Sequence, residues 1–187
     1  MSEDESDSVT DILPRKEVYS QLIAILTNRR KSTEGNLLIG LDEPSLRQVL
    51  GEEENFQSLI DEFNEYILGL GLTVVEFHYN GLVWRAIKSL YSAPIELSEE
   101  ELAVLGTMIM LCDQQERQRI EYTVLVNYLV QREFFTDYRI RKLIQSLQTN
   151  GYVEREGKYL AFGPRTLIEF TDEAREQIAL QAHDLLF

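Results

Sequence analysis

The feature that most constrains this 187-residue chain is a helix-like apolar segment that runs into two short strands, and it occurs twice. In the first copy the strands LTVVEFHY and LVWRAIK flank Asn80-Gly81, which accepts the positive φ values of a type I′ turn. The second copy, 138–162, closes with YVEREGKYLAF, where either Glu156-Gly157 or Gly157-Lys158 forms the turn. We therefore expect two similar units, each ending in a hairpin.

Helical periodicity fills the rest of the first copy. The segment that starts near Pro14 has one apolar face, and the basic run Arg29-Arg30-Lys31 suits its C-terminal end. Asp42 and Pro44 favour the start of a brief helix over 45–50. A further helix begins near Asn55, and its predicted apolar face consists of Phe56, Leu59, Ile60, Phe63, Ile67 and Leu70.

The second copy carries clearer helix starts. Ser98 and Glu101 have the spacing of a capping box, which opens a helix that runs to about Cys112. A helix is predicted near 122–130, and Thr136-Asp137 caps another over 138–149. Beyond the second hairpin, one or two helical turns precede a terminal helix.

This order of elements predicts a mainly α chain with short β-hairpins, of the α+β class, because three helices and a two-stranded wing make a winged helix. We expect two tandem winged-helix domains, a first over 14–90 that dimerises and a second over 96–187 that includes the C-terminal helix. The acidic residues 1–13 are predicted to form a disordered tail.

Several classes of chemistry lack their signature residues. Cys112, His78 and His183 are the chain's only Cys and His residues, which is too few for a zinc cluster or an internal disulfide. No phosphate loop or nucleophile elbow occurs, so we expect no cofactor and no catalysis. The longest apolar run, 102–112, is too short to cross a bilayer, and the N-terminal segment does not resemble a signal peptide, so we expect an intracellular protein with no membrane contact.

The charge distribution limits nucleic-acid binding to one region. A formal net charge of −14 excludes a phosphate-binding surface over the whole chain, because such binding depends on Lys and Arg. The segment 129–158 is the exception, with a net charge of +2. In a winged helix the third helix and the wing lie side by side, so both can face a duplex. The candidate DNA-binding residues, called here the helix-and-wing cations, are Arg139, Arg141, Lys142, Arg155 and Lys158. The alternative is that they pair with Asp137, Glu154 and Glu156.

Three aromatic residues are candidate partner contacts. Phe134 and Phe135 are adjacent, and neighbours on a helix diverge by about 100°, so one of the two can face a protein partner. Burial of both in a loop plug is the alternative. Trp84 on the first hairpin is expected in the core or in a dimer interface.

Two segments resemble the kite family, the tandem winged-helix subunits of SMC-kleisin complexes, and within it the MAGE-type subunit and its RING-bearing sister. They are YILGLGLTVVEFHYNGLVWRAI, similar to the helix end and hairpin of the family's first winged helix, and GKYLAFGPRTLIEFTDEAREQI, which looks like an aromatic strand running into Gly-Pro-Arg and a terminal helix. The chain lacks the Cys and His set of a RING domain. Bacterial ScpB-like members also lack that domain, so the branch of the family stays open.

The resemblance implies a non-catalytic accessory subunit that supports DNA entrapment, chromosome organisation and DNA repair. Kite proteins dimerise with a like or unlike kite subunit and bind the kleisin, which bridges the SMC ATPases. Some also touch double-stranded DNA without sequence preference, and here the helix-and-wing cations are the residues that match. The alternative class is a tandem winged-helix transcription regulator or RNA polymerase accessory factor, with Arg139, Gln145 and Gln148 as candidate base-reading residues.

Overall fold

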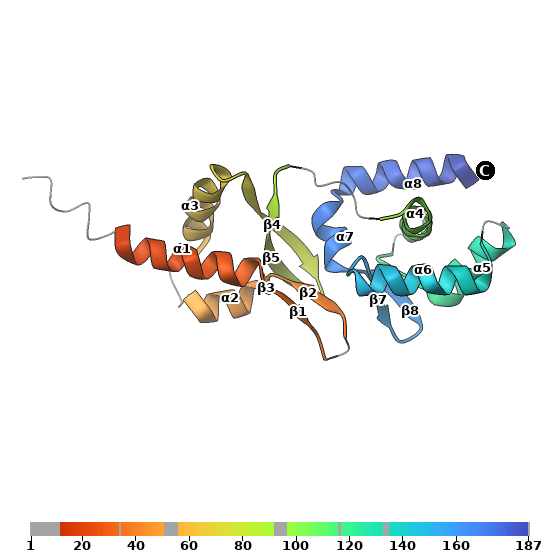
Figure 1. Cartoon of the computed structure of the whole chain (residues 1–187), viewed down its shortest axis with the longest axis horizontal. Helices are drawn as coiled ribbons and strands as arrows, with labels where there is room; N and C mark the ends of the chain where they lie inside the picture. The colour runs from red at the N-terminus through yellow and green to blue at the C-terminus, as the bar shows by residue number, and fades with distance from the viewer. Residues whose placement is uncertain are drawn as a thin grey trace, which may run out of the picture. The chain divides into compact units, whose positions relative to one another are not determined.

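The computed structural model describes residues 12–33, 35–50, 56–91, 97–115, 117–132 and 135–186 (Figure 1). The chain divides into two compact units, Met1–Arg29 with Ile39–Ala93 and Arg30–Leu38 with Pro94–Phe187. The first unit contains α1 (Ile12–Leu26), β3 (Leu41–Asp42), α2 (Glu43–Leu50), α3 (Phe56–Leu68), β4 (Leu72–Tyr79) and β5 (Leu82–Ser89). The second contains α4 (Glu99–Gln114), β6 (Arg119–Glu121), α5 (Tyr122–Gln131), α6 (Asp137–Thr149), β7 (Val153–Glu156), β8 (Tyr159–Phe162), α7 (Pro164–Glu169) and α8 (Asp172–Leu186).

Both units have the same order of elements: a helix, a short strand, two helices and a hairpin. Their three-stranded sheets also match, with the orders β3-β5-β4 and β6-β8-β7. The structure thus confirms the predicted α+β class with two tandem winged-helix units. The short strands β3 and β6 were not predicted as sheet partners, because runs of two and three residues carry no readable alternation.

Two-residue turns set the register of both wings. In the first, Tyr79 pairs with Leu82, and the intervening Asn80 and Gly81 have φ values of 51° and 73°. These positive values are the ones that a type I′ turn requires, so the prediction from Asn-Gly is confirmed. In the second wing Glu156 pairs with Tyr159, which selects Gly157-Lys158 as the turn.

The predicted helix starts are also confirmed. The side chain of Asp42 accepts a hydrogen bond from the Ser45 amide at 2.9 Å at the start of α2. Ser98 and Glu101 form both bonds of the capping box, and Thr136 accepts from the Arg139 amide at 3.3 Å. Each cap satisfies amides that have no partner within the helix.

Each unit has its own hydrophobic core. In the first, α1, α2 and α3 pack together through Leu22, Leu46, Phe56 and Phe63, and Val74 of β4 packs on them. In the second, α4 is buried along most of its length, and α5, α6 and β8 surround it. Ala174 and Ile178 of α8 pack against this core, so the C-terminal helix belongs to its own unit.

Two predictions about helix ends were wrong. Arg29-Arg30-Lys31 does not end a helix; it forms β1 (Arg29–Lys31), which pairs with β2 (Leu37–Ile39). The chain leaves α1 at Leu26 and turns back, and the Gly40 amide donates to the Asn28 carbonyl at 3.0 Å. Leu70 lies beyond the end of α3 and is 62% exposed.

The motif Gly163-Pro164-Arg165, which carries part of the family resemblance, has a structural role. The Gly163 amide donates to the Tyr152 carbonyl at 2.8 Å, and a Cβ on Gly163 would lie 2.3 Å from the Gly151 carbonyl oxygen. Pro164 starts α7, where its missing amide hydrogen costs nothing. The Arg165 guanidinium lies 4.4 Å from the centre of the Tyr152 ring. The motif thus joins the end of α6 to α7.

We predict that Gly163→Ala destabilises the protein by about 1–3 kcal/mol, because the added methyl group forces two backbone segments apart. The matched control is Gly69→Ala, where the nearest atom to the new Cβ is 3.7 Å away. Urea unfolding monitored by circular dichroism measures both. Equal stability of Gly163→Ala and the wild type would show that the close approach is not a constraint.

Arg85 of β5 is the main buried charge of the first unit. Its side chain is 4% exposed and contacts Glu43 of α2 at 2.5 Å and Glu76 of β4 at 2.8 Å. Its hydrogen bond, followed by that of Arg47, holds the pKa of Glu43 below its ordinary value. Arg47 also lies over the ring of Phe56, at 4.0 Å from its centre. The second helix and both wing strands are therefore joined through one guanidinium.

We predict that Arg85→Leu lowers the free energy of unfolding by about 2–4 kcal/mol, since removing one partner leaves Glu43 and Glu76 without their shared cation. Arg47→Leu is the matched control, because Arg47 binds the same Glu43 but is 44% exposed, and we expect a loss below about 1 kcal/mol. Chemical denaturation of both variants checks the order. A larger loss for Arg47→Leu would contradict the assignment.

Candidate nucleic-acid and partner interfaces

The helix-and-wing cations all lie on the exposed surface of the second unit, and three of them are in ion pairs. Arg139 at the start of α6 binds Glu100 of α4. Arg141 binds Asp137 at 2.8 Å, and Lys158 in the wing turn binds Glu121 at 3.0 Å. In each case the hydrogen bond to the carboxylate is the first cause of a raised pKa of the cation. The local charge is therefore largely neutralised.

The remaining two contact aromatic rings. The Lys142 ammonium lies 4.8 Å from the centre of the Tyr138 ring, and the Arg155 guanidinium lies at the same distance from Tyr122. Arg155 also donates to the Gly157 carbonyl at 3.2 Å.

The start of α5 brings part of this set together. Tyr122 lies under Arg155, interacts electrostatically with Arg141, and donates its amide to the Lys158 carbonyl at 2.9 Å. Arg139 is instead tied to α4. Of the carboxylates that the sequence offered as alternative partners, Asp137 binds Arg141, whereas Glu156 binds Arg119 at 3.4 Å.

The candidate partner aromatics are placed differently from one another. Trp84 is 6% exposed and lies edge-on to Tyr79, with ring centres 5.3 Å apart. Its indole N–H has no hydrogen-bond acceptor within the part of the chain that the structure describes. Phe135 is half-buried and packs against the second core, and Phe134 lies outside the described residues.

An exposed apolar surface of the first unit was missed by sequence analysis. It consists of Leu68, Leu70, Leu90 and Tyr91, which are 42%, 62%, 51% and 79% exposed, and we call it the α3–β5 patch. The Leu90 amide donates to the Gly71 carbonyl at 2.9 Å, which joins the two segments. Gly69 and Gly71, which predict the end of α3, were the signal that the leucines beyond it leave the buried face.

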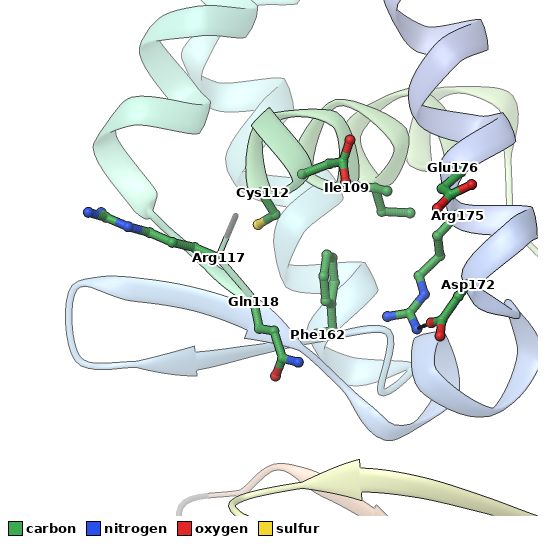
Figure 2. A pocket seen from close by; sticks show the side chains of 9 residues that line it. Ile109, Cys112, Arg117, Gln118, Phe162, Asp172, Arg175 and Glu176 are labelled. Atoms are coloured by element: carbon green, nitrogen blue, oxygen red, sulfur yellow. Dashed lines mark hydrogen bonds and ion pairs between the residues drawn. The ribbon is translucent and has the colours of Figure 1, made fainter. Parts of the chain in front are cut away.

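The second unit contains a cavity of about 320 Å³ between the end of α4, β8 and the start of α8. Figure 2 shows Ile109 and Cys112 of α4 above Phe162 of β8, with Arg175 bound to Asp172 at one side. The Arg117 guanidinium extends away from the other labelled side chains. The cavity thus has an apolar floor and a charged rim.

Cys112 in this cavity is unsuited to nucleophilic chemistry. Its side chain is almost fully buried, and burial raises the pKa of its thiol to about 12. The reactive thiolate is therefore rare at neutral pH. Among the described residues, no group of three His, Cys, Asp or Glu side chains could hold a metal ion. Likewise, none of the helices in the described ranges combines the length and hydrophobicity that crossing a membrane requires.

We predict that Cys112 of the native protein reacts with a thiol-specific disulfide reagent at pH 8 at least about 100-fold more slowly than in denaturant. The control is the same reagent on the urea-unfolded protein, where Cys112, the chain's single cysteine, is free to react. Comparable rates in the two states would contradict the raised pKa.

Comparison with known proteins supports the fold. No protein-family model and no curated protein matches the sequence. Among solved structures, a chain of an Nse1-Nse3-Nse4 complex is similar with a TM-score of 0.53 and 13% identity, over 95% of this chain and 76% of that chain. At this identity the likeness concerns the fold alone. It supports the kite-like architecture that the sequence motifs predict.

Proposed function

We propose that the chain is a non-catalytic kite-type accessory subunit of an SMC-kleisin complex, which pairs with a second winged-helix subunit and binds the kleisin. The observation that carries the proposal is the fold: the similarity to a chain of an Nse1-Nse3-Nse4 complex extends over 95% of this chain, so it includes both winged-helix units. The proposed setting is intracellular, on chromosomal DNA.

The α3–β5 patch suits the second subunit. Tyr91 and Leu70, the most exposed of its four members, lie beside the hydrogen-bonded junction of α3 and β5, so the fold presents both from an ordered segment. Next to the patch, Tyr66 of α3 is 52% exposed and stacks on Tyr19 of α1, with ring centres 5.1 Å apart. Exposed aromatic and aliphatic side chains on a rigid base are typical of subunit interfaces.

The cavity of the second unit suits the kleisin. An amphipathic helix that binds a winged helix needs a recess for an apolar anchor and polar groups around it. Ile109, Cys112 and Phe162 offer such a recess, and Arg117, Gln118 and Glu176 lie on its rim. The proposed affinity comes from the buried anchor and not from net charge.

The assembly is tested by purifying the full chain through an affinity tag from the cells that encode it and identifying the bound proteins by mass spectrometry. An SMC ATPase, a kleisin and a second winged-helix subunit are the expected partners. RNA polymerase subunits in their place would refute the proposal and support the transcription-factor class, as would binding to a single DNA operator.

The patch gives a sharper prediction. Leu70→Asp with Tyr91→Asp should weaken association with the second subunit at least about 100-fold, because charges replace apolar side chains at an interface. Val49→Asp is the matched control, since Val49 of α2 is 54% exposed but lies outside the patch. Sedimentation analysis of the purified subunits measures both. An equal effect of the two variants would remove the patch as the interface.

A further inference from the structure

The short hairpin β1–β2 carries the longest run of consecutive cations in the sequence, Arg29-Arg30-Lys31. All three side chains are exposed, and none forms an ion pair with any part of the chain that the structure describes. They differ in this from Arg139, Arg141 and Lys158, each of which is bound to a carboxylate. We call them the hairpin cations.

We propose that the hairpin cations form a binding site for the phosphate backbone of double-stranded DNA. Phosphate binding gains its free energy from the release of counterions condensed on the duplex, and this gain is largest for cations with no competing carboxylate. Glu34 is the only acidic residue within 29–39, so the hairpin has a net charge of +2 in a strongly acidic chain.

The geometry of the strand supports a duplex over a single row of charges. Successive side chains of a strand point to opposite faces, so Arg29 and Lys31 lie on one side of β1 and Arg30 on the other. A two-stranded ribbon is one of the elements that the major groove of B-DNA, about 12 Å wide, can admit. Cations on both faces of such a ribbon can meet the phosphates of both groove walls.

The rest of the hairpin favours a soluble polyanion over a membrane surface. The described residues of its turn are polar or small (Ser32, Thr33, Gly35 and Asn36), and interfacial membrane binding requires exposed aromatic or aliphatic side chains. The apolar residues of β2 are partly or fully buried. Leu37 lies where a Cβ on Gly151 would approach to 2.7 Å, so the hairpin is held against the residue that follows α6.

The test is a titration of a labelled duplex of random sequence with the full chain, followed by fluorescence anisotropy over a series of salt concentrations. Wild type should bind with an affinity that falls steeply with salt. The variant with Arg29→Ala, Arg30→Ala and Lys31→Ala should lose at least about tenfold in affinity and reduce the slope of log K against log salt by about 3.

The matched control removes the same charge from α6, with Arg139→Ala, Arg141→Ala and Lys142→Ala. We expect a smaller loss for this variant. A charge-conserving variant, Arg29→Lys with Arg30→Lys, should retain the wild-type slope, and it keeps the test informative if the alanine variant does not fold.

Two outcomes would overturn the proposal: an unchanged slope in the hairpin alanine variant, and a wild type that binds anionic vesicles but no duplex. This inference rests on the DNA-bound setting of the proposed function, but the two fail separately. The hairpin variant is expected to copurify with the same partner subunits as the wild type, whereas a wrong functional proposal would show in the copurified proteins.

Discussion

The central wing strand is the element on which each unit depends. β5 pairs with β4 on one edge and with β3 on the other, and β3 leads directly into α2. This register sets Arg85 opposite both Leu41 and Glu76, which lets its guanidinium reach Glu43 at the start of α2. A slip of one residue would move Arg85 to the other face of the sheet and break the connection. The Asn80-Gly81 turn prevents such a slip, because only a two-residue loop fits its φ values.

Local signals in the sequence predicted most of the fold. Asn80-Gly81, the Ser98–Glu101 capping box and Thr136 act through bonds to residues nearby in the chain, and each was confirmed. The missed elements depend on distant partners. β6 is a strand because Ile120 pairs with Leu160, and Arg29–Lys31 is a strand because β2 lies beside it. No periodicity within three residues can show either pairing.

The candidate sites were less predictable than the fold, because a residue type does not show whether its charge is already paired. The helix-and-wing cations were chosen by their spacing on one helix and one wing. Pairing of Arg139 with Glu100 joins residues far apart in the sequence, so it could not be read from spacing. The hairpin cations were visible as a run of three, but their assignment to a helix end concealed that the run is free and exposed. Similarly, the leucines of the α3–β5 patch became visible only when α3 ended at Leu68.

The two kinds of exposed surface suggest different partners for one chain. Apolar side chains of the α3–β5 patch offer area for a protein subunit, while the hairpin cations offer unpaired charge to a duplex. The overall charge of −14 limits DNA contact to such a local site. A subunit of this kind would bind its protein partners through buried area and DNA through a small, salt-sensitive contact.

Hydrogen–deuterium exchange of the full chain, alone and then with duplex DNA or with the second winged-helix subunit, tests this division most directly. The account predicts that DNA slows exchange in the β1–β2 hairpin, Arg29–Ile39, and that the subunit slows it around Leu68–Gly71 and Leu90–Tyr91. Protection by DNA confined to α6 and the second wing, with the hairpin unchanged, would contradict it.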